Sequence, residues 1–240
     1  MKEQTHNFGD GNGPVPAHRH IKGNGWVADT ANVHNSAYIG EDALVYGNAL
    51  VYGNALVSGD ALVHDNALVY GNARVYGDAW VSGNAWVSGS AWVSGDARVS
   101  GDARVHGDAR VYGDARVHGD ALVYGNAWVS GDARVSGDAR VYGDARVSGN
   151  ARVDNAWVSG DACVSGDARV KRGMYTSTPT SITRSDGYMF TLQSDGSIVA
   201  GCGDFTPDEA KAYWGNPEHH KHRESMAIIS AFNAIQTARS

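Results

Sequence analysis

Residues 93–117 read VSGDARVSGDARVHGDARVYGDARV, a run in which one six-residue pattern recurs without a break. The pattern has the form V-[SYH]-G-[DN]-A-[RLW] and extends far beyond this run in both directions. From Val27 to Val153, 21 of the 22 sixth positions are Val and one is Ile39; from Ala31 to Ala151, all 21 are Ala. Such a period is typical of repeat proteins, in which each unit stacks on its neighbours.

The alternation of side chains along a strand explains which residue occupies which place in the repeat. Val points inward and its two neighbours point outward, while Gly followed by Asp or Asn allows a corner and Ala fills the narrow space inside it. The pattern therefore predicts a solenoid with an interior of Val and Ala. Because no chemistry can take place in such an interior, any function must lie on the outer faces, at the ends or in the C-terminal segment.

The repeat resembles the hexapeptide-repeat family, in which an aliphatic residue is followed four places later by a small one. Residues 182–188, 200–202 and 205–210 resemble the small domain that follows such repeats in YdcK-like and prophage-encoded bacterial proteins. The resemblance implies an all-β solenoid, a left-handed parallel β-helix of about eight triangular coils, followed by a small α+β domain. We expect an N-terminal cap or arm over residues 1–25, the β-helix over 26–170, and a capping or oligomerisation domain over 171–240.

The C-terminal segment has its own secondary-structure signals. Residues 181–184, 188–193 and 197–200 read as short strands, the last two joined by a Ser-Asp-Gly turn. Thr206 and Glu209 form a capping box, which predicts a helix ending near Trp214. An apolar stripe predicts a final helix through Ile228, Ile229, Phe232 and Ile235.

One irregularity interrupts the repeat near its end. The step from Val153 to Val158 is five residues, and the corner Gly is missing. It is open to two interpretations, a tightened corner or a functional bulge.

The triangular coil that the resemblance implies contains three hexads, so 18 residues return the chain to the same face and the outward residues before each core position fall into three columns. All three columns begin apolar and become cationic. In the first half of the repeat region, five outward leucines are followed by three tryptophans that form a belt around one coil: Leu44, Leu50, Leu56, Leu62, Leu68, Trp80, Trp86 and Trp92. We expect another subunit to cover this region, the five leucines forming the interface of a homotrimer or dimer.

Tryptophan and arginine alternate in one of the columns. Its spacing suits stacking of guanidinium groups on indoles at Arg74, Trp92, Arg110, Trp128 and Arg146. Two interpretations stay open: a ladder that only stabilises itself, or a recognition surface that includes these residues together with Trp80 and Trp86. Trp and Arg dominate binding hot spots in protein interfaces, which favours a protein partner.

The corners of the predicted β-helix place seven acidic residues and one Asn along one edge: Asp42, Asp60, Asp78, Asp96, Asp114, Asp132, Asn150 and Asp167. Residues 26–170 contain 10 Arg, no Lys and 17 Asp plus Glu, so their net charge is 10 minus 17, or −7. The edge could bind cations, or mimic nucleic acid and so inhibit a host protein that binds it. Alternatively, Asp is present because it tolerates a left-handed corner.

The positions of the histidines in the repeats bear on whether the protein is an enzyme. The resemblance includes acyltransferases and γ-class carbonic anhydrases, whose sites lie between subunits and use a catalytic His or three zinc-binding His. Here the outward histidines are scattered over different coils, and no loop is inserted to enclose a substrate: His34, His64, His106 and His118. We expect no catalytic residue, no metal and no cofactor, with an acyltransferase acting at a subunit interface as the alternative. Weaker candidates are His18 with His20, and Cys202 with His219, His220 and His222.

Composition limits the remaining classes. No apolar run is long enough for a membrane span and no leader segment is evident, so the expected location is the cytoplasm, not a membrane. Two cysteines cannot form a disulfide framework. The pI of about 5.9 argues against nucleic acid as a partner. The sequence thus predicts a non-enzymatic β-helix that presents a rigid Trp/Arg/Asp-rich surface to a macromolecular partner, and the resemblance implies a phage or prophage origin.

Overall fold

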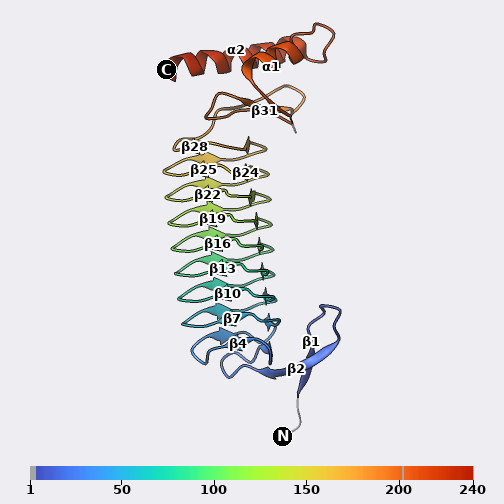
Figure 1. Cartoon of the computed structure of the whole chain (residues 1–240), viewed down its shortest axis with the longest axis vertical. Coiled ribbons are helices and arrows are strands. Elements are labelled where there is room, and N and C mark those ends of the chain that lie inside the picture. The colour runs from blue at the N-terminus through green and yellow to red at the C-terminus, as the bar shows by residue number, and fades with distance from the viewer. Residues whose placement is uncertain (1–3, 202, 240) are drawn as a thin grey trace.

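Three sheets wind around a common axis and form a tall solenoid that carries the repeat region (Figure 1). The computed structural model describes residues 4–201 and 203–239. Each turn contributes one short strand to each sheet and advances by about 4.8 Å, and there are about eight turns. The predicted fold class is confirmed: a parallel β-solenoid of the left-handed β-helix type, followed by a small domain with an antiparallel sheet and two helices.

The strands of the solenoid are two or three residues long except for β2 at the N-terminus, and their spatial order follows the winding of the chain. The first sheet contains β1 (Thr5–Asn7), β2 (Pro14–Arg19), β3 (Trp26–Ala28), β6 (Leu44–Val45), β9 (Leu62–Val63), β12 (Trp80–Val81), β15 (Arg98–Val99), β18 (Arg116–Val117), β21 (Arg134–Ser136), β24 (Arg152–Asp154) and β27 (Arg169–Val170). The second sheet contains β4 (Asn32–Val33), β7 (Leu50–Val51), β10 (Leu68–Val69), β13 (Trp86–Val87), β16 (Arg104–Val105), β19 (Leu122–Val123), β22 (Arg140–Val141), β25 (Trp157–Val158) and β28 (Met174–Tyr175). The third sheet contains β5 (Tyr38–Ile39), β8 (Leu56–Val57), β11 (Arg74–Val75), β14 (Trp92–Val93), β17 (Arg110–Val111), β20 (Trp128–Val129), β23 (Arg146–Val147) and β26 (Cys163–Val164).

The interior is built as the repeat predicts. From Ala37 to Ala151, the Val and Ala positions of the repeat, with Ile39, are fully buried. Gly at the corners is required by the backbone: Gly101 has φ +69°, and a Cβ there would lie 3.0 Å from the amide nitrogen of Gly119 in the next turn. Stacked turns therefore approach each other too closely at this corner for a larger residue.

The five-residue step at the end of the repeat is a tightened corner. Asn155 takes the left-handed conformation, with φ 53°, that glycine adopts at other corners. Its side-chain oxygen accepts a hydrogen bond from the amide of Asp138 at 2.9 Å, which fills the space of the missing residue. The register continues beyond it, with Arg140 paired to Trp157 and Arg146 to Cys163.

An antiparallel hairpin closes the N-terminal end of the first sheet. Strand β2 pairs with β1 and with β3, His18 lying opposite Val27. The following loop covers the first strand of the third sheet, because the carbonyl of Lys22 accepts the amide of Ile39 at 3.0 Å. The exposed strand edges at this end are thus partly covered by the chain itself, which limits uncontrolled stacking of one molecule on another.

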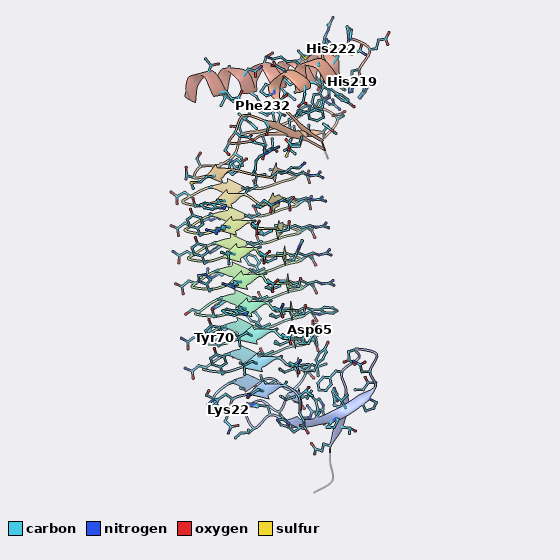
Figure 2. All side chains as sticks on the ribbon, in the orientation of Figure 1. Lys22, Asp65, Tyr70, His219, His222 and Phe232 are labelled. Carbon is cyan, nitrogen blue, oxygen red and sulfur yellow. The ribbon has the colours of Figure 1, made fainter. Side chains whose placement is uncertain are left out.

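The C-terminal domain packs two helices on a four-stranded antiparallel sheet. The sheet consists of β29 (Ser181–Thr183), β30 (Met189–Leu192), β31 (Ile198–Ala200) and β32 (Gly203–Phe205), and the helices are α1 (Pro207–Trp214) and α2 (His222–Arg239). Strand β32 was not predicted, and His222, one of the weaker site candidates, is the first residue of α2. The predicted capping box is present, since Thr206 and Glu209 exchange hydrogen bonds. Phe190, Trp214, Ile229 and Phe232 form the buried core of the domain, and Figure 2 labels Phe232 on α2.

Ionic contacts attach the start of α2 to the turn after β29. Glu224 accepts hydrogen bonds from Lys221 at 2.9 Å and from the amide of Ser185 at 3.0 Å. These donors, the Lys221 ammonium first, lower the pKa of Glu224 to about 2. The guanidinium of Arg184 likewise holds the pKa of Asp186 well below its usual range.

The domain lies on the C-terminal end of the solenoid (Figure 1). Tyr175 and Met189 pack on the last Val and Ala residues of the interior. The side chain of Gln193 donates to the carbonyl of Arg169 at 2.8 Å and accepts the amide of Lys171 at 2.9 Å, so it serves backbone groups at the last strand edge. Neither α1 nor α2, the helices of the described chain, is long and apolar enough to cross a membrane.

Candidate interaction surface

The outer surface arranges side chains in rows that run parallel to the solenoid axis (Figure 2). Every parallel pair matches equivalent positions of successive turns; Trp92, for example, lies opposite Arg74 on one side and Arg110 on the other. The three predicted columns are therefore the outward residues of the three sheets. Side chains that are 18 residues apart in sequence lie side by side on one face.

Arginine and tryptophan alternate along the third sheet and stack on one another. The Arg74 and Arg110 guanidinium carbons lie 5.0 and 5.3 Å from the centre of the Trp92 ring. Those of Arg110 and Arg146 lie 5.1 and 5.3 Å from Trp128. We call these five residues, Arg74, Trp92, Arg110, Trp128 and Arg146, the Arg–Trp ladder. Each indole contacts two guanidiniums, and each such contact stabilises by about 0.5–1 kcal/mol at an exposed site.

The other tryptophans of the repeats stack with arginines on different faces. Arg98 lies 4.7 Å from Trp80 on the first sheet, and Arg104 lies 4.7 Å from Trp86 on the second. Trp80, Trp86 and Trp92 belong to successive strands of one turn, so they form the predicted belt but face in three directions. A partner that contacts the ladder as well as Trp80 or Trp86 must therefore extend around a corner of the solenoid.

Two hollows lie beside the Arg–Trp ladder, one above the other. They have volumes of about 280 and 260 Å³ and share Asp108 and Arg110. Their polar walls come from the corner residues next to the ladder: Asn72, Ser90, Asp108, Asn126 and Asp144. Among the residues that the structure describes, Arg110 makes no hydrogen bond or ion pair, so its N–H groups are available to a partner.

The five leucines of the predicted subunit interface are half-buried and lie on all three faces. Leu44 and Leu62 are on the first sheet, Leu50 and Leu68 on the second, and Leu56 on the third. Leu44 also packs with Phe8 in a cluster formed by the N-terminal hairpin. The hairpin of the same chain therefore covers part of this apolar region. The sequence did not predict this contact.

A second kind of ladder was not predicted from the sequence. On the second sheet, the outward residue after each core Val is aromatic at several successive turns. Tyr52 stacks on Tyr70 with ring centres 5.0 Å apart, and His106, Tyr124 and Tyr142 stack at 5.1 and 4.9 Å. Desolvation raises the pKa of Tyr124. Desolvation, and to a lesser extent the positive charge of Arg104, lowers the pKa of His106. The signal was present in the sequence, as Tyr or His at intervals of 18 residues.

Corner residues form ladders of their own. The side-chain amide of Asn66 donates a hydrogen bond to the side-chain oxygen of Asn84 at 3.1 Å, and the side-chain amide of Asn84 donates to the carboxylate of Asp102 at 2.9 Å. On the predicted acidic edge, Asn150 donates to Asp167 at 2.8 Å. Corner side chains thus hydrogen-bond their counterparts in the next turn, which supports a structural role for Asn and Asp at these positions.

The outward histidines of the repeats lie apart from one another. His64 stacks on Tyr46 at 4.8 Å, His106 on Tyr124 at 5.1 Å, and His34 contacts Ser36 at 2.7 Å. Nδ1 of His18 lies 2.8 Å from Asp29, and His20 is buried. Within residues 4–201 and 203–239, no group of three or more His, Cys, Asp or Glu could hold a metal ion. Cys202 lies outside the described residues.

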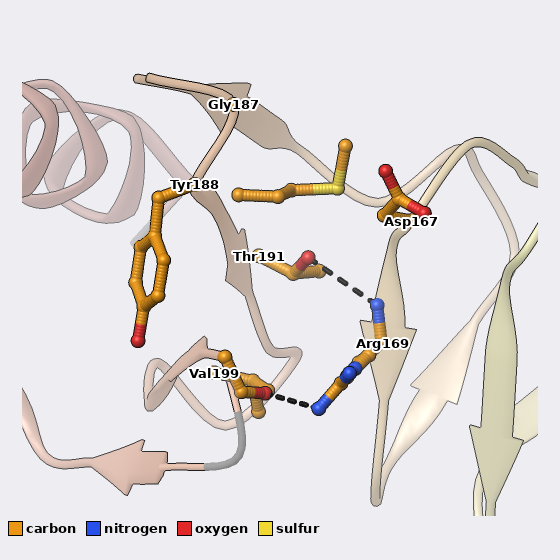
Figure 3. Close-up of a pocket in the computed structure, with 8 residues that line it drawn as sticks. Asp167, Arg169, Gly187, Tyr188, Thr191 and Val199 are labelled. Carbon is orange, nitrogen blue, oxygen red and sulfur yellow. Dashed lines mark hydrogen bonds between the residues drawn. The ribbon is translucent and has the colours of Figure 1, made fainter. Parts of the chain in front are cut away.

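A cavity of about 210 Å³ lies where the C-terminal sheet meets the last turn (Figure 3). Arg169 crosses it, donating its backbone amide to Thr191 Oγ1 at 3.4 Å and its guanidinium to the carbonyl of Gly201. These bonds join the solenoid to the domain. The polar groups at this place serve the junction between the two parts of the chain.

The repeat region is the part of the chain that a known family model matches. A family model described as the YdcK β-solenoid repeat matches residues 43–59, 51–65, 67–83, 79–95, 93–107, 103–119, 109–125, 115–131 and 133–148. No curated protein matches the chain. The chain is similar to the structure described as "Activity and Crystal Structure of Francisella novicida UDP-N-Acetylglucosamine Acyltransferase", at 14% identity and a TM-score of 0.30, covering 88% of this chain and 87% of that one. A likeness this low carries no argument about activity.

Proposed function

Because residues 43–148 of this chain match the YdcK β-solenoid repeat, we propose that the protein is a rigid, non-enzymatic scaffold that presents its outer surface to a protein partner. The Val and Ala interior leaves no room for chemistry. The side chains able to recognise another molecule lie in straight rows on the outside, at the spacing of the turns.

One observation carries this proposal, the Arg–Trp ladder with its two adjoining hollows. Its indoles and guanidiniums are held by each other before any partner arrives. A surface whose long side chains are already ordered loses less conformational entropy on binding, by about 0.5–1.5 kcal/mol for each side chain. Trp and Arg are also the residues most enriched in binding hot spots. The Asn and Asp side chains beside the ladder supply acceptors around its cations.

Replacing both ladder tryptophans tests the proposal. The Trp92→Leu/Trp128→Leu variant is expected to lose the partner that the immobilised wild-type protein captures from cells, with a weakening of about tenfold or more, because two hot-spot indoles are removed. Binding is measured by quantitative mass spectrometry of the captured proteins.

The matched control is Trp157→Leu, which makes the same change on the second sheet, where Arg140 stacks at 4.5 Å. It is expected to capture the partner normally. Equal capture by the double variant and the wild type would refute the role of the ladder.

We propose further that the protein is a homotrimer or dimer, associated through the leucines of its first turns. Native mass spectrometry is expected to show one such oligomer, and Leu50→Lys/Leu68→Lys is expected to convert it into monomer, since charges would replace apolar contacts on the second face. Leu122→Lys makes the same change on that face but farther along the solenoid, and should leave the mass unchanged. A wild-type protein that is purely monomeric contradicts this proposal.

A further inference from the structure

The aromatic ladder of the second sheet is interrupted at one turn. Tyr70, Ser88 and His106 occupy equivalent positions of three successive turns, as the pairing of β10, β13 and β16 shows. Tyr70 stacks on Tyr52 below, and His106 stacks on Tyr124 above. Ser88, which stands between them, has no ring.

A cavity of about 350 Å³ occupies the place of the missing ring. We call it the Ser88 cleft; it is lined by Tyr70, Trp86, Ser88, Arg104, His106 and the backbone of Gly89 and Gly107. Figure 2 marks its lower side at Tyr70, on the outer face of the solenoid. Successive strands lie about 4.8 Å apart, so Tyr70 and His106 are separated by about twice that distance. A planar ring between them would lie about 5 Å from each, the spacing of stacked aromatic pairs.

The lining of the Ser88 cleft includes one cation, Arg104. Arg104 stacks on Trp86 at 4.7 Å and makes no hydrogen bond or ion pair with any described residue. Within the described part of the chain, no carboxylate lines the cleft. At the adjoining corner, Ser90 stands where the turns before and after it carry Asn72 and Asp108. An anionic group next to the inserted ring would therefore find a donor and little repulsion.

We propose that the Ser88 cleft receives an aromatic side chain of a protein partner, adjacent to an acidic residue of that partner. This inference rests on the proposed function and adds the chemistry of the partner. The cleft is open to solvent, and Trp86 is 40% exposed. A small free aromatic molecule would make few contacts there, too few to offset the translational and rotational entropy that it loses on binding. For a side chain of a larger partner, the contacts of the whole interface offset that entropy loss.

The test uses a short peptide in which 5-fluorotryptophan lies between two aspartates, followed by ¹⁹F NMR as the protein is added. The wild-type protein is expected to bind saturably with a dissociation constant on the order of 1 mM, as two ring contacts and one charged contact allow. Replacing the aspartates of the peptide by lysines should weaken binding. Arg104→Gln should weaken it about threefold to tenfold.

The deciding variant is Trp86→Leu/Ser88→Tyr, which completes the ladder with the protein's own ring. It recreates the Leu-Val-Tyr sequence of residues 50–52 and 68–70 on the same sheet, so it is expected to fold. Peptide binding should fall about tenfold or more, because the added tyrosine occupies the cleft. Ser148→Tyr adds the same ring on the third sheet and should have no effect.

Unchanged peptide binding by the double variant would overturn the inference. Equal affinity for free indole-3-acetate would overturn the choice of a protein side chain and assign the cleft to a small aromatic acid. Either failure is distinguishable from failure of the proposed function, since the Arg–Trp ladder lies on the third sheet and capture through it is measured separately.

Discussion

Removal of residues 171–240 is expected to leave a folded solenoid that associates end to end into long assemblies. The deletion exposes the edges of β25, β26 and β27 and the last residues of the Val and Ala interior, on which Tyr175 and Met189 pack. It also removes Gln193 and Thr191, the partners of the Arg169 carbonyl and amide. The regular turns still stabilise one another, because each repeat contacts only its neighbours.

Association of this kind does not close on itself, because one end of the solenoid pairs with a different surface of the next molecule. Light scattering and electron microscopy of the truncated protein should show particles that lengthen with concentration. A truncated protein that also carries Arg169→Pro is the control: proline removes the donor at the exposed edge, and association should decrease. A truncated protein that stays at its original size would show that the domain is an independent appendage.

Val117→Asp is expected to lower the free energy of unfolding by more than about 4 kcal/mol, a large effect for a single substitution. Val117 is fully buried in the middle of the solenoid, between Val99 and Val135 of adjacent turns. An aspartate there would have only apolar neighbours. Each turn is stabilised by its contacts with the neighbouring turns, so a disrupted turn in the middle should uncouple the two halves of the solenoid. One cooperative unfolding transition should then become two.

Urea denaturation followed by circular dichroism measures this effect. Arg116→Asp places the same carboxylate one residue earlier, on the exposed side of the same strand, and should change stability by less than about 1 kcal/mol. If Val117→Asp and Arg116→Asp unfold at the same urea concentration, the interior is not the source of stability.

The repeat allowed the fold and the columns to be predicted because a single rule, inward Val and outward neighbours, holds at nearly every turn. The Arg–Trp ladder followed from the same period together with the resemblance to triangular hexapeptide-repeat coils, in which residues 18 positions apart are adjacent. The contact of Phe8 with Leu44 could not be predicted, because it depends on how a non-repeating hairpin folds back. The Ser88 cleft required the structure as well: a lone Ser has meaning only once Tyr70 and His106 are seen on either side of it.

The C-terminal domain shows a different limit. Its helices were predicted from a capping box and an apolar stripe, both local signals. Strand β32 was missed because Gly203 and Asp204 are poor strand formers, and it is held by antiparallel pairing with β31. The role of Gln193 was also invisible in the sequence, since its partners, Arg169 and Lys171, belong to the solenoid.

The claim that the Arg–Trp ladder contacts a protein partner is tested most directly by photo-crosslinking in cells. A benzophenone amino acid is placed at Ser130, beside Trp128 on the third sheet, and for comparison at Ser100 on the first. The account predicts a covalent adduct of one discrete mass from position 130, absent from position 100 and lost in the Trp92→Leu/Trp128→Leu background. The absence of any adduct at position 130, or equal adducts at both positions, would contradict it.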